Sequence, residues 1–77
     1  MKLQTSADLI EFLNAVSHCQ GEVLFTTTDG DRLNLKSELS RYVFLTAASD
    51  SEILSDGEVL CKADSDARIL RSFMRED

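Results

Sequence analysis

Residues 22–35, EVLFTTTDGDRLNL, decide the fold class of this chain. The first half of the stretch is rich in β-branched and aromatic residues, as β-strands are, and a second alternating stretch begins at residue 31. Between them lies Asp29-Gly30, the two-residue signature of a tight hairpin turn. The stretch therefore predicts a β-hairpin, against which the remaining elements must pack.

The register of this hairpin depends on the length of its turn. If the turn has two residues, Leu24, Leu33 and Leu35 share one face of the sheet, which we assign to the core. Val23 and Phe25 then point to the other side. Either this second face is partly covered or the turn is longer, and both interpretations stay open.

An amphipathic helix is predicted on the N-terminal side of the hairpin. Thr5-Ser6-Ala7-Asp8 has the spacing of a helix capping box, so the helix is expected to begin near Ser6 and to end near Gly21. The preceding residues 1–4, MKLQ, are expected to form a short edge strand. The apolar face of the helix recurs at three- and four-residue spacing and contains Leu9, Ile10, Phe12, Leu13, Val16 and Cys19.

A change of apolar period after the hairpin predicts a second, shorter helix that begins at Ser37 and whose end stays open. Residues 46–57 are polar and rich in small side chains, which is typical of a connection. The one apolar pair in this segment, Ile53-Leu54, is expected to pack back onto the core.

A strand and a final helix are predicted at the C-terminal end. Residues 58–63, EVLCKA, predict the strand, and Asp64, Ser65 or Asp66 can cap the helix that follows. The apolar face of this helix contains Ala67, Ile69, Leu70, Phe73 and Met74. The whole order predicts an α+β open-faced sandwich, a single domain over residues 1–77 with a mostly antiparallel sheet and three helices on one face.

The charge balance excludes several classes of partner. Fourteen acidic and eight basic residues give a net charge of -6, which opposes attraction to nucleic-acid backbones or anionic lipids. No apolar run reaches the roughly 18 residues that a membrane span needs, and the N-terminus lacks the pattern of a signal peptide. The expectation is therefore a soluble cytoplasmic protein that binds neither nucleic acid nor membrane.

The element order resembles the HPr family, the histidine-containing phosphocarrier proteins of the bacterial sugar phosphotransferase system. The resemblance covers nearly the whole chain and is carried by Asn34-Leu35-Lys36-Ser37 after the hairpin and by GEVLCKADSD, residues 57–66, before the last helix. The resemblance implies an HPr-like fold. It also implies that Ser37 corresponds to a serine that an ATP-dependent kinase phosphorylates in many members of the family.

The chain departs from the HPr pattern at two places. The family's carrier histidine lies in a loop just before the first helix, where this chain has LQTSA, residues 3–7, without histidine, arginine or proline. The single histidine, His18, falls near the C-terminal end of the predicted helix, where the helix dipole disfavours a bound phosphate. Glu38 beside Ser37 would also repel a phosphate. The chain therefore resembles a degenerate member without phosphocarrier chemistry.

No residues in the sequence form a recognisable catalytic or metal-binding pattern. Cys19 and Cys61 are too far apart in sequence for a metal-binding pair and are expected to be buried free thiols, and His18 lacks an orienting carboxylate and a nucleophile on its own side of the helix. We expect no enzyme activity, no metal and no cofactor. Ser37 is interpreted as the N-cap of the second helix, with phosphoacceptor as the alternative.

A protein-binding role is the remaining expectation. Lys36, Arg41 and Lys62 are expected to give a small basic spot near the second helix of an acidic molecule. Arg41 and Tyr42, beside Leu39, are residue types enriched in binding hot spots. Packing of Leu39 and Tyr42 in the core is the simpler expectation for apolar residues at helical spacing. The sequence thus predicts a non-catalytic, regulatory or protein-binding module. The alternatives are a phosphotransfer component regulated or phosphorylated at Ser37, and a homodimer through an exposed sheet face or edge.

Overall fold

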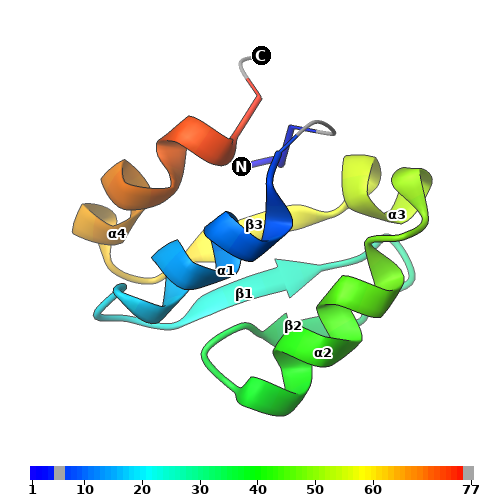
Figure 1. Ribbon diagram of the computed structural model, residues 1–77, viewed down its shortest axis with the longest axis horizontal. Helices are drawn as coiled ribbons and strands as arrows, with labels where there is room; N and C mark the ends of the chain where they lie inside the picture. Colours follow the sequence, from blue (N-terminus) through cyan, green and yellow to red (C-terminus); the bar gives the residue numbers. More distant parts are fainter. Residues whose placement is uncertain (5–6, 76–77) are drawn as a thin grey trace.

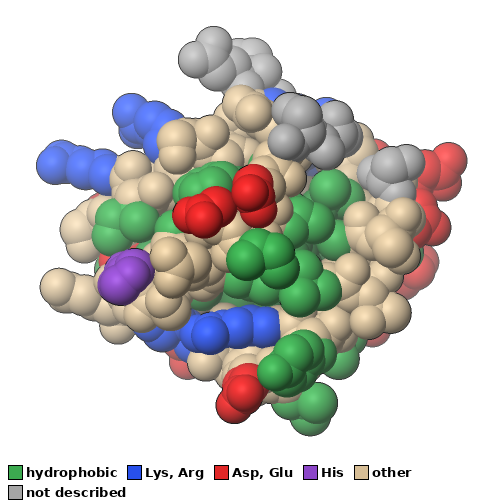
Figure 2. Space-filling view, in the orientation of Figure 1, with side chains coloured by type: hydrophobic (Ala, Val, Ile, Leu, Met, Phe, Trp, Pro, Cys, Tyr) green, Lys and Arg blue, Asp and Glu red, His purple; other side chains and the backbone are tan. Residues whose placement is uncertain are grey.

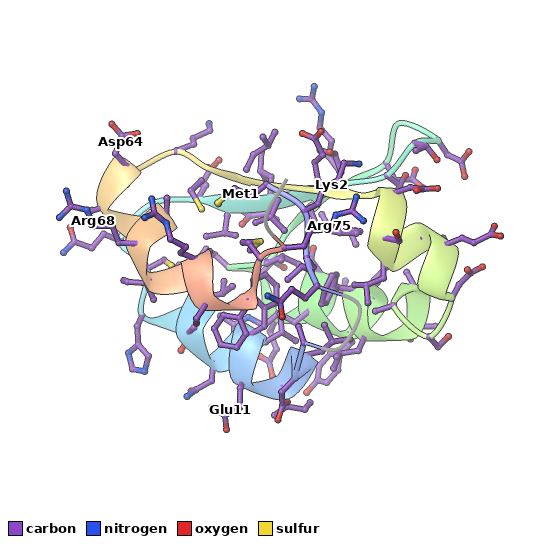
Figure 3. All side chains as sticks on the ribbon, turned by 90° about the horizontal axis from the view of Figure 1, so that it is seen from above. Met1, Lys2, Glu11, Asp64, Arg68 and Arg75 are labelled. Atoms are coloured by element: carbon purple, nitrogen blue, oxygen red, sulfur yellow. The ribbon has the colours of Figure 1, made fainter. Side chains whose placement is uncertain are left out.

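The computed structural model describes residues 1–4 and 7–75, and these form an α+β fold with four α-helices and a three-stranded antiparallel sheet (Figure 1). The strand order is β2-β1-β3, and α1, α2 and α4 lie on one side of the sheet (Figure 3). The elements in chain order are α1 (Leu9–Ser17), β1 (Val23–Thr26), β2 (Arg32–Asn34), α2 (Glu38–Ala47), α3 (Ser51–Asp56), β3 (Glu58–Cys61), α4 (Asp64–Leu70) and the 3-10 helix η1 (Arg71–Phe73).

The predicted hairpin is present as β1 and β2, but its turn is longer than two residues. The Thr27 amide donates to the Asp31 carbonyl at 3.0 Å, and the Gly30 amide donates to the Thr27 carbonyl at 3.1 Å. Gly30 has a φ of 91°, a conformation that residues with a Cβ rarely adopt. The turn therefore occupies residues 27–31.

The longer turn changes which face of β1 is buried. Leu24 pairs with Asn34, and Phe25 pairs with Leu33, so the two-residue-turn register is wrong by one residue. A shift of one residue exchanges the two faces of a strand. Val23 and Phe25 are accordingly buried in the core, and Leu24 lies on the open face of the sheet.

Three aromatic rings link the helices to the sheet. The ring centroids of Phe12 on α1 and Phe44 on α2 are 5.8 Å apart, and those of Phe44 and Phe25 on β1 are 5.0 Å apart. Gly57 completes this core because a Cβ at this position would lie 2.2 Å from the Cζ atom of Phe25. Close aromatic packing thus joins the helix layer to the covered face of the sheet.

The first helix is shorter than the sequence pattern predicts at both ends. It begins at Leu9 after the N-cap Asp8, rather than near Ser6, and it ends at Ser17, rather than near Gly21. The Asp8 carboxylate accepts hydrogen bonds from the amides of the next turn, which explains the later start. Thr5 and Ser6, the first half of the expected capping box, lie outside the described residues.

The connection at residues 46–57 contains a helix that the sequence pattern did not predict. The Asp50 side chain accepts a hydrogen bond from the Glu52 amide at 2.9 Å and so caps α3. The expected packing of Ile53-Leu54 is confirmed, because Leu54 is buried and Ile53 packs against the core. With α3, the described chain has one helix more than predicted.

The C-terminal elements are present with altered details. The strand at residues 58–63 forms as β3, but the N-cap of α4 is Ala63 rather than an acidic residue or serine. Leu70 and Met74 are buried as expected, whereas Ile69 is 42% exposed. No helix within residues 1–4 and 7–75 is both long and apolar enough to cross a membrane.

The N-terminal segment pairs with two parts of the chain that are distant in sequence. Met1 and Val59 exchange backbone hydrogen bonds of 2.7 and 3.1 Å, which join the N-terminal segment to β3. Leu3 then forms an isolated antiparallel bridge with Met74. The expected edge strand is therefore reduced to single pairs, and the bridge between Leu3 and Met74 holds the N-terminal and C-terminal segments side by side (Figure 1).

Candidate functional site

The face formed by α1 and α2 contains Lys36, Arg41 and Tyr42, three of the site residues that the sequence singled out, and they line one groove. Lys62, the third cation of the expected basic spot, instead follows β3 and pairs with Glu22 at 3.1 Å. Ser37 is the N-cap of α2 by its extended backbone, with φ of -85° and ψ of 129°, as predicted. Its side chain is exposed, and in the described part of the chain it makes no capping hydrogen bond. The hydroxyl of Ser37 therefore does not explain the start of α2. The preceding turn is instead held by Asn34, whose side-chain oxygen accepts from the Lys36 amide at 3.0 Å.

Lys36 joins this face to the end of the first helix. Its ammonium group donates to the carbonyl oxygens of Val16, at 3.4 Å, and of Cys19. The Val16 carbonyl also accepts from the Cys19 amide at 3.0 Å, and a cation at this place complements the negative end of the helix dipole. Lys36 is therefore a structural contact between α1 and α2 as well as a cation on this face.

Among the described residues, Arg41 is anchored by a hydrogen bond from one of its nitrogens. Its Nε donates to the carbonyl oxygen of Leu35 at 2.7 Å, which fixes the guanidinium beside the start of α2. This hydrogen bond uses one of five guanidinium N–H donors, so the group can still bind a carboxylate in the bidentate manner typical of arginine.

Leu39 and Tyr42 do not pack in the core, contrary to the simpler expectation. Leu39 is 74% exposed and Tyr42 is 61% exposed, and Val43 beside them is 47% exposed. The buried residue of α2 is Phe44, on a different face of the helix. Single exposed apolar residues are common on protein surfaces, but three on one helix face form a continuous stripe.

A groove lies beside this stripe, between α1 and α2. It has a volume of about 450 Å³ and is lined by Leu13, Lys36, Glu38, Arg41, Tyr42 and Leu45. Leu13 and Leu45 supply apolar walls, and the two cations exceed the one carboxylate. Ile10 on the same side of α1 is 65% exposed. Figure 2 shows hydrophobic side chains gathered over α1 and α2 on this side.

The start of α1 is occupied by a carboxylate. The Asp8 Oδ1 atom accepts from the Ile10 amide at 3.1 Å and from the Glu11 amide at 3.2 Å. These are the helix-terminal donors that would hold a phosphoryl group at this place. His18 lies at the opposite end of α1, about 15 Å away at 1.5 Å per residue, as its C-cap.

His18 and the two cysteines are the side chains that the sequence analysis considered for catalysis or metal binding. His18 is exposed and Cys19 is buried, so these sequence neighbours face different sides, as expected. The expectation of buried free thiols is confirmed for Cys19, whereas Cys61 is only half-buried. Burial raises the pKa of both thiols, which disfavours the reactive thiolate form. Nowhere in residues 1–4 and 7–75 do three histidine, cysteine or acidic side chains gather as a metal site requires.

Asp66 has a role that sequence reasoning missed. It was expected at a solvated helix cap, yet its side chain is only 1% exposed. It accepts from the Gln20 amide at 3.0 Å and from the Gly21 amide at 2.8 Å, and these hydrogen bonds hold the pKa of its carboxyl below the ordinary value. Asp66 therefore ties the loop after α1 to α4. No sequence signal distinguishes it from Asp64, because its partners are backbone groups about 45 residues away.

Comparison of the chain with protein-family models, curated proteins and solved structures finds no match.

Proposed function

We propose that this chain is a non-catalytic, HPr-like protein-binding module of the bacterial cytoplasm. Its docking surface is the α1–α2 face, which we define as Ile10, Lys36, Leu39, Arg41 and Tyr42. The observation that carries the proposal is the pair Leu39 and Tyr42, which α2 holds 74% and 61% exposed beside a groove of about 450 Å³.

The energetics of burial support a docking role for this pair. Removing a large apolar side chain from water stabilises a complex by about 1.5 to 3 kcal/mol when burial is complete. Tyrosine and arginine are enriched in binding hot spots, and Arg41 is already fixed by its hydrogen bond to Leu35. The face therefore presents a preorganised apolar and cationic surface, which lowers the entropic cost of binding.

The charges of the groove specify the chemistry of the partner. Lys36 and Arg41 exceed Glu38 there, although the whole chain carries a net charge of -6. A partner segment that combines apolar side chains with a carboxylate would pair with Arg41 and bury Leu39 and Tyr42.

A second copy of the chain is a poorer match for this face than such a segment, because a two-fold interface here would bring the same cations together. Light scattering is expected to give a concentration-independent monomer mass, and a mass that doubles on concentration would favour the homodimer.

The occupied start of α1 supports the absence of phosphocarrier activity. A phosphoryl group at this place would meet the Asp8 carboxylate, which already uses the amides of Ile10 and Glu11. Incubation with phosphoenolpyruvate and the upstream phosphotransferase enzyme tests the point, with an HPr protein as the positive control. We expect label on the HPr protein and none on this chain. Label on this chain would overturn the non-catalytic proposal and favour a phosphotransfer component.

Phosphorylation at Ser37 is a second candidate function, favoured by the exposed hydroxyl that makes no capping bond in the described residues. A phosphate there would lie at the positive end of the α2 dipole, but Glu38 would repel it and the Lys36 ammonium is engaged with α1 carbonyls. Incubation with an HPr kinase and ATP, followed by intact mass measurement, decides the question. A phosphate added to the chain and lost in Ser37→Ala would establish this regulation, and an unchanged mass would remove it.

A further inference from the structure

A second groove lies on the other side of α2, between that helix, the hairpin turn and α3. It has a volume of about 380 Å³. Its apolar part is supplied by Leu33 of β2, Val43 and Ala47 of α2 and Ile53 of α3. Val43 is 47% exposed, so part of this apolar surface is open to solvent. The size and the apolar lining are within the range of surfaces that bind peptide side chains and small ligands.

The polar rim of this groove is built by the hairpin turn. Thr27, Thr28, Asp29 and Asp31 line it. The turn is held in shape by the bond from the Thr27 amide to the Asp31 carbonyl and by the bond from the Asp31 amide to the Thr27 Oγ1 atom at 3.2 Å. The side chains of Asp29 and Asp31 are exposed and form no ion pair with another described residue.

The electrostatic field at this end of the molecule is negative. One cation, Arg32, lines the groove among the described residues, and it is exposed. Two further cations reach α3, since the Lys2 Nζ atom donates to the Asp56 carbonyl at 3.0 Å and the Arg75 Nη2 atom donates to the Ser55 carbonyl at 3.4 Å. The turn and α3 with its cap still contribute more carboxylates than these three cations offset, and Figure 2 shows acidic side chains along the edge where these elements lie. These acidic residues are Asp29, Asp31, Asp50, Glu52 and Asp56.

We propose that the groove between the hairpin turn and α2 binds a basic, amphipathic peptide segment of a partner protein. Aliphatic side chains of the segment would cover Val43 and Ile53, and a lysine or arginine would reach Asp29 and Asp31. Charge complementarity selects this occupant, because an acidic segment would meet two unpaired carboxylates. The inference goes beyond the α1–α2 face, since this groove has the opposite charge and lies on the opposite side of α2.

Backbone amide shifts in nuclear magnetic resonance test this proposal with defined probes. One probe is a hexapeptide with alternating leucine and lysine and blocked termini, and the matched probe has glutamate in place of lysine. We expect the lysine peptide to shift amides of residues 27–33 and 43–47 and the glutamate peptide to shift none of them. The affinity for the lysine peptide should fall as salt is raised, because exposed charges are screened.

Two double variants distinguish the effect of the groove carboxylates on affinity from the effect of the net charge of the chain. Asp29→Asn combined with Asp31→Asn should lower the affinity for the lysine peptide about fivefold. This factor corresponds to the loss of two exposed ion pairs of about 0.5 kcal/mol each. Glu11→Gln with Asp64→Asn removes the same charge from exposed positions elsewhere and should leave the affinity within about twofold. The proposal is overturned if both double variants lower the affinity equally, or if the glutamate peptide binds as well as the lysine peptide. It is also overturned if the lysine peptide shifts no amides of residues 27–33, or shifts only amides of the α1–α2 face.

Discussion

Leu39 and Leu35 offer a matched comparison between a surface and a core leucine four residues apart. Leu39 is 74% exposed, whereas Leu35 is fully buried. Leu39→Ala should therefore change the free energy of unfolding by less than about 0.5 kcal/mol. Leu35→Ala should reduce it by about 2 to 5 kcal/mol, because the substitution leaves a cavity. Urea unfolding measures both, and a large loss of stability in Leu39→Ala would show that its side chain has a folding role.

Asp66 should make the stability of the protein depend on acid pH. Its hydrogen bonds from the Gln20 and Gly21 amides lower its pKa in the folded state. The ionised Asp66 carboxyl therefore stabilises the fold fully above its pKa in the unfolded chain, which is about 3.9 for aspartate. This stabilisation is lost as the pH falls through the lower pKa of the folded state. In Asp66→Asn the unfolding midpoint should be lower at pH 7 and should fall less between pH 5 and pH 2.

Asp64 supplies the control for this effect. It lies two residues before Asp66 and is exposed. Asp64→Asn should keep the acid-dependent fall in stability of the unmodified protein. If Asp66→Asn and the unmodified protein lose stability in parallel as the pH falls, the proposed tie between α4 and the loop after α1 is wrong.

At the scale of elements, α1 depends on a cation from outside the helix. The Lys36 ammonium donates to the Val16 and Cys19 carbonyls at its C-terminal end. Lys36→Met keeps the aliphatic part of the side chain and removes these bonds, so it should reduce the free energy of unfolding by about 1.5 kcal/mol, as for other hydrogen bonds to charged groups. Amide hydrogen exchange in the last turn of α1 should become faster.

Lys62 is the matched cation for that experiment. It forms an exposed ion pair with Glu22 at 3.1 Å. Lys62→Met should change the stability by less than about 1 kcal/mol, as is usual for surface ion pairs. If Lys36→Met and Lys62→Met reduce the free energy of unfolding equally, Lys36 contributes no more to stability than an ordinary surface ion pair.

The elements that the sequence predicts correctly are those with strong local signals. The hairpin, α2 at Ser37 and the strand β3 are all present, because turn residues and a change of apolar period mark them. The helix α3 has six residues and one apolar pair, too short to show a helical period. The hairpin register fails for a different reason, because it depends on backbone bonds of residues 27–31 that Asp29-Gly30 alone does not fix.

The position of the candidate site was predictable only in part, and its exposure was not. Lys36, Arg41 and Tyr42, which were expected near one another, line one groove. Leu39 and Arg41, two residues apart on α2, point to nearly opposite sides of the helix. However, α2 has two sets of apolar residues at helical spacing, and a periodic pattern does not tell which set is buried. Packing of Phe44 against Phe12 and Phe25 decides it, and this contact joins three separate elements. The stripe of Leu39, Tyr42 and Val43 is exposed as a consequence.

On the scale of the whole molecule, α2 is a ridge between two surfaces of opposite charge. The groove toward α1 has an excess of cations, and the groove toward the hairpin turn has an excess of carboxylates. Such an arrangement selects partners by charge and fixes the orientation in which they approach. Both surfaces follow from the same packing of Phe44 and Leu45 against the core, which leaves Leu39, Tyr42 and Val43 exposed.

The measurement that tests the central claim most directly is quantitative affinity capture from the cells that make this protein, with three forms of the chain as bait. The unmodified chain is compared with Leu39→Ala combined with Tyr42→Ala, and with Ile69→Ala. Ile69 is the matched control, since it is 42% exposed on α4, away from the α1–α2 face. We predict a partner that the unmodified chain and Ile69→Ala retain equally and that the double variant retains at least about tenfold less. Equal recovery on all three baits, or a loss with Ile69→Ala alone, would contradict the α1–α2 face as the docking surface.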